Sequence, residues 1–508
     1  MAILLASVPI LLILVLMVGL RWGAARAGAA GYLTALLIAI FYFGAGPQLL
    51  AVAHSKALLL ALDVLLIIWA AFLLYRVADE AGAIRVIGDA LPHLTADRGM
   101  QALIIGWAFA SFLQGVGGFG VPVAVVAPIL VGLGFAPLAA VLIPSIGHGW
   151  SVTFGSLGSS FQALVSATNQ PEEILAPPAA FFLGVACVLV GLEVAHAAGG
   201  WSALRRLLGA VLIIGTSMAV VQWLAVRSGA WPIAAFLGGL AGLLVCIPLA
   251  RRHRGEAGNN GQLDRRALLI AMSGYIILVV LTLILQVIPA VKEALGGVYI
   301  QIDFPQTSTQ LGYVTAAGAS RKIPVFRHAG AVLLYTCLAS YLVYRWAGLY
   351  KSDAPRRILH GTVQRVMSSS VSIISMVAMA VIMEYAGMTD ILARGLAEGM
   401  GRLFPWISPW IGALGAFMTG SNTNSNVVFG GLQMQTALLL GFPVAIILAA
   451  QTAGAGLASI MAPTKVVVGA STAGMAGHEG EVMRKLIVYT GLMVLLIGLL
   501  AAISVRLF

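Results

Sequence analysis

Six neighbouring polar residues interrupt an apolar stretch in the segment GSNTNSNVVFGG (420–431), namely Ser421, Asn422, Thr423, Asn424, Ser425 and Asn426. Their hydroxyl and amide groups carry no net charge, so they can bind a carboxylate or a cation and release it again. At membrane depth such groups are tolerated only where protein buries them or a watery cavity borders them. We therefore expect a broken membrane helix that lines a binding site.

A second break is indicated by QGVGGFGVP (114–122). Glycines such as Gly117, Gly118 and Gly120 let the chain bend and expose backbone groups to a ligand. Gln114 precedes them and adds an amide. We expect Gln114 and these glycines to form one side of the substrate site, and residues 421–426 to form the other.

Further polar residues lie among small residues downstream of each break. His148 could titrate near neutral pH and take part in proton coupling, or it could be a neutral structural histidine. Lys465 could pair with a carboxylate, or its side chain could extend from a hairpin tip to water. Ser145, Gln451 and Thr452 are binding candidates, although such residues often serve helix packing instead.

Acidic residues that could carry a coupling ion are scarce; they are Asp63, Glu193 and Glu384. The ion-coupling candidates are Asp63 and Glu384, with His148 as a third. Enzyme motifs are incomplete. The GVGGFG stretch (115–120) lacks the strand and acidic residue of a dinucleotide site, HEGE (478–481) is followed by Val482 rather than by histidine, and there is no Walker A sequence. We expect no enzyme activity, no cofactor and no metal.

Membrane spans must position these residues, because only 9% of the 508 residues are charged and the mean hydropathy is +1.00. Runs near the roughly 20 residues needed to cross a bilayer occupy 2–20, 28–46, 57–76, 178–196, 207–226, 231–250, 267–289, 329–346, 367–386 and 486–506. Regions 99–169 and 404–477 are apolar but interrupted by Gly, Pro and small polar residues. We expect an all-α polytopic membrane protein that contacts the lipid bilayer.

The net charge of +11 reflects short basic loops rather than nucleic acid binding. By the positive-inside rule, the loops that carry Arg76, the block 251–266 and the pair Arg484 and Lys485 are cytoplasmic. Both termini then lie outside. The loop 290–328 is an exception, because it should be external and yet is basic, with Arg321, Lys322 and Arg327.

An internal repeat relates the two interrupted regions. DEAG (79–82) is matched by EYAG (384–387), Gly134-Phe135 by Gly441-Phe442, and Ser145 with Gly147-x-Gly149 by Thr452 with Gly454-x-Gly456, at offsets of about 305 to 307 residues. Loop charges indicate that the copies are inverted. The chain then divides into N-terminal spans (1–78), copy 1 (79–170), intervening spans with a cytoplasmic loop at 251–266 (171–383), copy 2 (384–477) and a C-terminal span (478–508).

At these same residues the chain resembles the L-lactate permease family. The resemblance rests on the segments 114–140, TFGSLG (153–158), TGSNTNSNVVFGGLQ (419–433) and APTKVVVGASTAGMAGHEGEVMR (462–484). It implies 12 to 14 helices and proton-coupled uptake of L-lactate, glycolate and related 2-hydroxy monocarboxylates across a bacterial inner membrane.

The chain departs from that family pattern at four places. Gln114 and Asn422 stand where the family typically has acids, and Lys465 stands where an uncharged residue is typical. The segment SIGHGWSVTFGS (145–156), which contains His148, replaces an NTAPVAFGA-like stretch. These departures suggest a retuned site and put the usual proton pathway in doubt.

We therefore expect a secondary active transporter that carries a small carboxylate by proton symport through alternating access. A sodium-coupled carrier of another organic anion on the same fold is the nearest alternative. A membrane-embedded enzyme and a channel are alternatives from other classes. The oligomeric state, and the choice between elevator and rocking motions, stay open.

Overall fold

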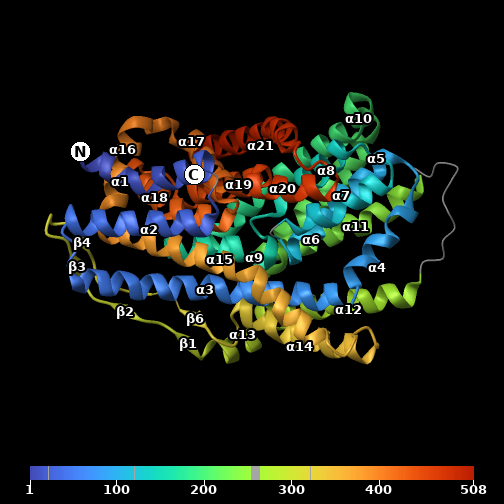
Figure 1. The fold of residues 1–508 in the computed structure, drawn as a ribbon, viewed down its shortest axis with the longest axis horizontal. Coiled ribbons are helices and arrows are strands. Elements are labelled where there is room, and N and C mark those ends of the chain that lie inside the picture. The colour runs from blue at the N-terminus through green and yellow to red at the C-terminus, as the bar shows by residue number, and fades with distance from the viewer. Residues whose placement is uncertain (21, 119, 253–263, 321, 508) are drawn as a thin grey trace.

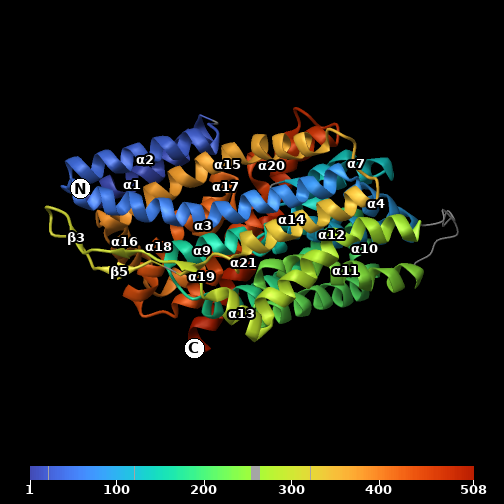
Figure 2. The ribbon, with the colours of Figure 1, turned by 90° about the horizontal axis from the view of Figure 1, so that it is seen from below.

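The computed structural model describes residues 1–508 except 21, 119, 253–263, 321 and 508. The described chain is mainly helical, and most long helices lie along one direction of an elongated molecule (Figures 1 and 2). Each of the ten predicted spans corresponds to a helix, although 28–46 runs past the end of α2 at Phe41. The helices are α1 (Ala2–Leu14) with η1 (Val15–Gly19), α2 (Ala24–Phe41), α3 (Pro47–Glu80), α10 (Glu172–Arg227), η5 (Trp231–Ile233) with α11 (Ala234–Arg252), α12 (Arg265–Thr282) with η6 (Leu283–Val287), α14 (Ala329–Trp346), α15 (Ala354–Tyr385) and α21 (Glu479–Leu507).

Helix α10 contains two of the predicted spans, because its path breaks at Gly199 and Gly200 (φ 66°). Within the described residues, nine helices are long and apolar enough to cross a membrane, or up to ten if a bent pair at 137–168 counts as one span. That number is below the 12 to 14 helices that the family resemblance implies. Part of the difference arises because α10 counts once although it contains two predicted spans, and because the apolar helices at 2–17 and 121–132 are too short to count.

Copy 1 of the repeat is the broken region of 79–170. Its elements are α4 (Ala83–Ala90), η2 (Pro92–Leu94), α5 (Arg98–Gln101), η3 (Ala102–Phe109), α6 (Ala110–Val116), α7 (Val121–Gly132), α8 (Pro137–His148), η4 (Gly149–Ser151) and α9 (Gly155–Thr168). Copy 2, at 384–477, has α16 (Met388–Met400), η7 (Gly401–Leu403), α17 (Phe404–Thr419), α18 (Asn422–Leu440), α19 (Val444–Ala458), η8 (Ser459–Met461) and α20 (Pro463–Thr472).

The two copies follow the same local plan. A glycine with left-handed backbone follows the long helix α3 at Gly82 and the long helix α15 at Gly387. Another such glycine follows α7 at Gly134 and α18 at Gly441. A short 3-10 turn follows the next helix in both copies, as η4 and as η8. The repeat seen in the sequence is therefore also a repeat of backbone structure.

The long helices that enter the copies pack against each other in opposite directions. Lys56 near the start of α3 pairs with Glu384 at the end of α15 (3.1 Å). Arg357 at the start of α15 pairs with Glu80 at the end of α3 (2.8 Å between Nε and Oε1). Helices α3 and α15 are therefore antiparallel, as inverted copies require.

Contacts between the copies are reciprocal. A Cβ on Gly149 would lie 3.4 Å from Ile460, and a Cβ on Gly456 would lie 2.8 Å from the hydroxyl of Thr153. Each residue of the first contact has its counterpart 307 positions away in the second. Reciprocity of this kind is the signature of a two-fold relation.

The loop 290–328, which was predicted to be external, begins with α13 (Pro289–Gly296) and continues as a narrow antiparallel ribbon. Its pairs are β1 (Tyr299–Ile300) with β6 (Ile323–Pro324), β2 (Asp303–Phe304) with β5 (Gly318–Ala319), and β3 (Thr307–Ser308) with β4 (Val314–Thr315). The ribbon lies near the start of α3, where Gln310 donates to the carbonyl of Gly44 (3.2 Å). Of the basic residues that made this loop an exception, Arg321 lies outside the described residues.

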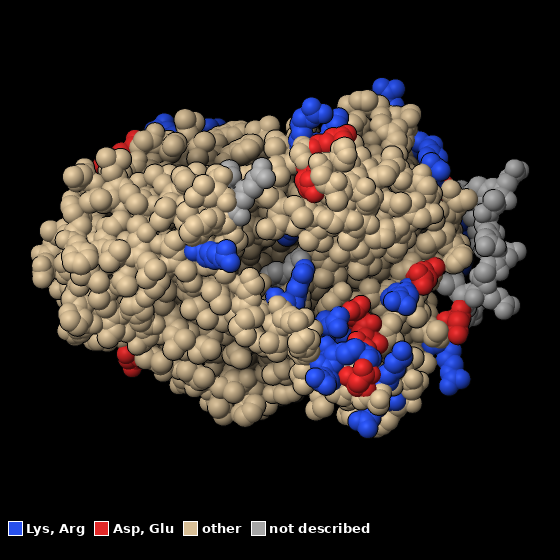
Figure 3. All heavy atoms as spheres, viewed as in Figure 1, with Lys and Arg blue, Asp and Glu red and all other residues tan. Residues whose placement is uncertain are grey.

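Charged side chains gather toward one end of the face in Figure 3, the end at which α4, α5 and α12 lie in Figure 1. The opposite end of that face is almost free of charge. This asymmetry agrees with the predicted cytoplasmic loops. Residue 21 and most of the block 251–266 lie outside the described residues.

Candidate functional site

The GSNTNSN segment is a break between two helices, as predicted. Gly420 (φ 71°) ends α17, and Ser421 caps α18 by accepting a hydrogen bond from the amide of Asn424 (3.3 Å). A Cβ on Gly420 would lie 2.7 Å from the hydroxyl of Thr464, so glycine is required here for space as well as for backbone conformation. The free amides and the positive dipole end of α18 therefore lie inside the helix bundle.

Buried side chains of this segment bind copy 1. The amide of Asn422 donates to the Thr153 hydroxyl (3.1 Å), and that of Asn426 donates to the Ser160 carbonyl (2.8 Å) and to the Thr452 hydroxyl (2.9 Å). The hydroxyls of Thr423 and Ser160 share a hydrogen bond (3.0 Å). The second break is therefore fastened to residues 153–160 of the first copy.

Three hydrogen-bond acceptors in the same segment have no donor among the described residues. The amide oxygens of Asn422, Asn424 and Asn426 are buried, and none has a hydrogen-bond partner among the described residues. An unmet buried acceptor is costly. These oxygens can receive a donor from a ligand, or they can bind a cation.

Two of the predicted binding residues hold copy 2 together. The hydroxyl of Ser425 donates to the Gly412 carbonyl (2.8 Å), and the amide of Gln451 donates to the Ser425 hydroxyl (3.1 Å). Both residues are fully buried. Their observed contacts join α17, α18 and α19 to one another.

The first break lies beside another bend of copy 1. Gly118 and Gly120 have positive φ, and so have Ser156, Leu157 and Gly158. A Cβ on Gly118 would lie 1.7 Å from the Ser156 hydroxyl, and one on Gly155 would lie 2.8 Å from the Gln114 amide nitrogen. Gln114 is buried, and its amide oxygen has no partner among the described residues. Gln114 and Gly118 therefore support the 153–160 segment, to which the second break is bound.

Gly117 lies against Tyr75, since a Cβ there would be 3.1 Å from that ring. Ser145 and His148 both bond to their own helix: the Ser145 hydroxyl donates to the Val141 carbonyl (2.7 Å), and Nδ1 of His148 lies 2.6 Å from the Pro144 carbonyl. His148 is fully buried, and its Nε2 has no partner among the described residues.

A polar cavity of about 340 Å³ lies at the N-terminus of α18. Lys465 and Arg365 line it together with Ser421, Asn424 and Ser372. The ammonium group of Lys465 also donates to the Ser459 hydroxyl (2.9 Å). Two cations and a helix N-terminus therefore border one cavity, which is the arrangement expected for an anion. The sequence reading missed Arg365, which lies in a long helix with no local motif.

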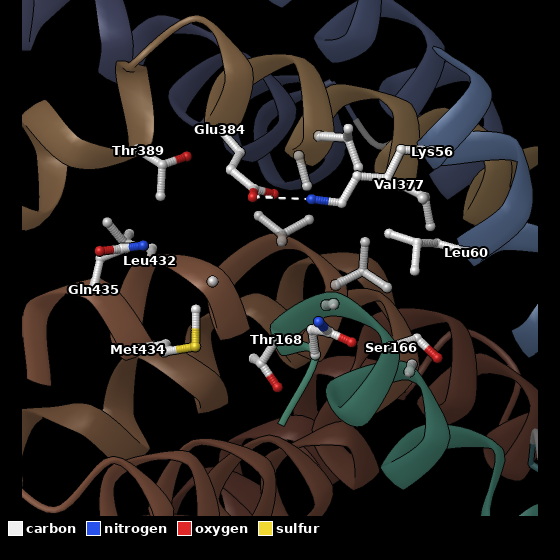
Figure 4. Close-up of a pocket in the computed structure, with 18 of the residues that line it drawn as sticks. Lys56, Leu60, Ser166, Thr168, Val377, Glu384, Thr389, Leu432, Met434 and Gln435 are labelled. Carbon is white, nitrogen blue, oxygen red and sulfur yellow. Dashed lines mark hydrogen bonds and ion pairs between the residues drawn. The ribbon is translucent and has the colours of Figure 1, made fainter. Parts of the chain in front are cut away.

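A second cavity, of about 80 Å³, has room for several water molecules. Figure 4 shows the ion pair of Lys56 and Glu384 on one side of it, and Ser166 and Thr168 from α9 on the other. Glu384, predicted as an ion-coupling candidate, thus lines this cavity and forms an ion pair with Lys56. Its partner Lys56 was not predicted.

The two cavities follow one another along the same helices. Residues 365–373 of α15 line the polar cavity, and residues 377–384 line the second one. Along α18, Asn424 lines the polar cavity and Val427 lines the second cavity. At the wall of the polar cavity, the amide of Asn424 donates to the Ser372 hydroxyl (3.0 Å). Helix α18 therefore borders both cavities, and this contact joins it to α15.

Asp63, the remaining predicted acid, lies near the middle of α3 and is 2% exposed. Its carboxylate accepts from the Gln162 amide (2.7 Å) and from the Ser166 hydroxyl, and it contacts Nε2 of His328 (2.9 Å). The sequence reading missed His328, because it falls in the basic loop just before α14.

The fold and these sites together define a polytopic membrane permease with two broken, inverted copies. The crystal structure of the Alcanivorax borkumensis YdaH transporter, described as having an unusual topology, is similar in fold (TM-score 0.51, 15% identity, covering 91% of this chain and 88% of that one). More specifically, the L-lactate permease family model matches residues 2–508, so the chain belongs to that family.

Relatives of known activity are permeases, not enzymes. The glycolate permease GlcA of Escherichia coli K12 is 27% identical, over 99% of this chain and 96% of its own. The L-lactate permease of Bacillus subtilis 168 is 28% identical over the same shares. That of Escherichia coli K12 is 27% identical, over 86% of this chain and 84% of its own.

Proposed function

We propose that this protein imports a 2-hydroxy monocarboxylate, such as L-lactate or glycolate, across a bacterial inner membrane by proton symport. Its relatives include L-lactate and glycolate permeases, which supports this substrate class. The orientation, with both termini outside, follows from the basic loops.

The observation that carries the proposal is the polar cavity at the start of α18. Lys465 and Arg365 attract the substrate carboxylate, and the amides at the start of α18 bind it. Ser421 and Asn424 bind the 2-hydroxyl group of the substrate, because the amide oxygen of Asn424 has no other hydrogen-bond donor among the described residues. Gln114 and the 117–120 glycines act indirectly, because they shape the segment that carries Thr153 and Ser160.

The two cavities support alternating access. The substrate would pass from one to the other only after the contact between Asn424 and Ser372 opens. Broken helices whose ends meet at a closed point suit a carrier better than an open channel. A single-channel current far above carrier turnover would contradict this mechanism.

The test is uptake of labelled L-lactate and glycolate into proteoliposomes, with the pH gradient and the sodium gradient imposed separately. We expect uptake to follow the pH gradient and to fall at least tenfold in Lys465→Met, since removing one partner of a buried charged contact costs about 2–5 kcal/mol. Lys351→Met, at an exposed loop position, is the control. Wild-type vesicles that accumulate neither substrate would refute the proposed substrates.

A sodium-coupled carrier remains the second candidate, and one observation favours it. The three unmet asparagine oxygens near the start of α18 are neutral ligands of the type that alkali cations accept. The separate gradients decide, because uptake driven by sodium at equal pH would replace proton coupling.

A further inference from the structure

We propose that the buried pair Asp63 and His328 binds the transported proton, and that α9 connects this pair to the substrate site. The inference rests on the proposed function and adds to it the residues that couple the two events. His328 is supplied by the loop before α14, and Asp63 by the middle of α3.

The hydrogen bonds define the protonation state of the pair in this conformation. Nδ1 of His328 accepts from the backbone amide of Gly330 (3.2 Å), so the ring proton is on Nε2. Nε2 then donates to Asp63, as do the amide of Gln162 and the hydroxyl of Ser166. Three donors to one carboxyl group favour its ionised form.

Adding one proton to this site must change its contacts. A protonated Asp63 carries a donor of its own, while the three groups around it are also donating. At least one neighbour must turn to become an acceptor or move away. Because a half-satisfied buried network is costly, protonation favours a rearrangement of the side chains that join Asp63 to α9 and to the start of α14.

Helix α9 is the element that can pass this change on. Gln162 and Ser166 on α9 bind Asp63. Ser160, two residues before Gln162 and on a different side of the helix, binds Thr423 (3.0 Å) and receives the amide of Asn426 at its carbonyl (2.8 Å). One helix therefore touches both the acid of α3 and the GSNTNSN break.

The surroundings give the proton a route from one side. Ser166 lines the cavity that also holds the ion pair of Lys56 and Glu384, as Figure 4 shows. The charged groups that line this cavity are Lys56 on α3 and Glu384 on α15, and His328 lies on the other side of Asp63; α9 has no ionisable residue. Of the two acids near this cavity among the described residues, Asp63 is buried and Glu384 is exposed, and the Ser166 side chain alone joins Asp63 to the cavity lining.

Asp63→Asn tests the proposal in two assays on the full-length protein in proteoliposomes. Exchange of labelled for unlabelled L-lactate at equal pH needs no net proton movement, and we expect it to stay within about threefold of wild type. Accumulation driven by a pH gradient, and lactate-driven alkalinisation outside the vesicles, should be lost. His328→Gln, which keeps a donor but cannot titrate, should retain exchange and shift the pH dependence of accumulation.

Glu193→Gln is the matched control. Glu193 is another buried carboxylate, on α10, whose oxygens have no hydrogen-bond partner among the described residues. We expect normal accumulation in this variant. Loss of coupling in Glu193→Gln with coupling retained in Asp63→Asn would overturn the assignment, and so would loss of exchange in a folded Asp63→Asn protein.

Failure of the proposed function can be told apart from failure of this inference. If wild-type protein transports no 2-hydroxy monocarboxylate, the proton site is measured without substrate, by infrared difference spectra of the purified protein at high and low pH. A carbonyl band of a protonated carboxyl group that is present in wild type and missing in Asp63→Asn supports the site. The same band in both proteins refutes it.

Discussion

Two contacts between the copies occupy equivalent places and differ in chemistry. Gly149 lies against the apolar side chain of Ile460, whereas Gly456 lies against the hydroxyl of Thr153. Only the second contact continues into a polar network, because Thr153 also accepts from Asn422 and donates to the Thr452 carbonyl (3.0 Å). The two-fold relation sets the spacing of the helices, and the side chains decide where the site forms.

The same difference holds one turn earlier in each helix. Ser145 of copy 1 bonds only its own helix in the observed contacts, while its counterpart Thr452 receives the amide of Asn426. Copy 1 contributes two sharp bends, at 117–120 and 155–158, and copy 2 contributes most of the polar side chains. A duplicated fold can thus keep its geometry twice and still place one asymmetric site between its halves.

The largest effect is expected where the copies are most alike. A Cβ on Gly147 would lie 2.0 Å from the Gly106 carbonyl, and one on Gly454 would lie 2.2 Å from the Pro409 carbonyl. Alanine at either position forces the packed backbones apart, and each change should lower the free energy of unfolding by about 1–3 kcal/mol. Thermal unfolding in detergent measures this.

Gly491→Ala is the control for those two variants, because a Cβ at this position in α21 meets nothing within 4 Å. It should leave the unfolding temperature unchanged or raise it. If only one of Gly147→Ala and Gly454→Ala is destabilised, the two close backbone contacts do not contribute equally to stability. The two copies would then not be equivalent in their packing.

A smaller effect is expected where the equivalent contacts differ. Thr153→Val keeps the shape of the side chain and removes the acceptor for the Asn422 amide, which leaves a buried donor unpaired. Uptake should fall about tenfold. Thr472→Val, whose hydroxyl bonds its own helix on a partly exposed surface, should transport normally. Normal uptake by Thr153→Val would mean that the polar network does not set the site.

The sequence predicted the spans, both breaks and the repeat, because these depend on local composition. Glycine and neutral polar residues within an apolar sequence indicate a broken membrane helix, whatever tertiary contacts surround it. The bend at 155–158 was not predicted, since Ser156 and Leu157 adopt left-handed backbone that their residue types do not favour. Tertiary contacts with Gln114 and Gly118 surround that bend.

Pairs that join distant segments were also missed. His328 lies 265 residues from Asp63, and Lys56 lies 328 residues from Glu384. Each partner came from a segment that looked ordinary by composition, a basic loop in one case and the start of a span in the other. Only the antiparallel packing of α3 and α15, and the docking of the α14 start on α3, bring these groups together.

The smallest expected effect sharpens the comparison at Ser145 and Thr452. Ser145→Ala removes one hydrogen bond within α8, so uptake should stay within about twofold of wild type. Thr452→Val removes an acceptor of Asn426, whose amide still reaches the Ser160 carbonyl, and a loss near 0.6 kcal/mol predicts uptake about threefold lower. Initial uptake rates at matched protein density measure both. Equal losses in the two variants would show that copy 1 contributes side chains to the site as copy 2 does. That result would contradict the view that copy 1 contributes bends and copy 2 contributes polar side chains.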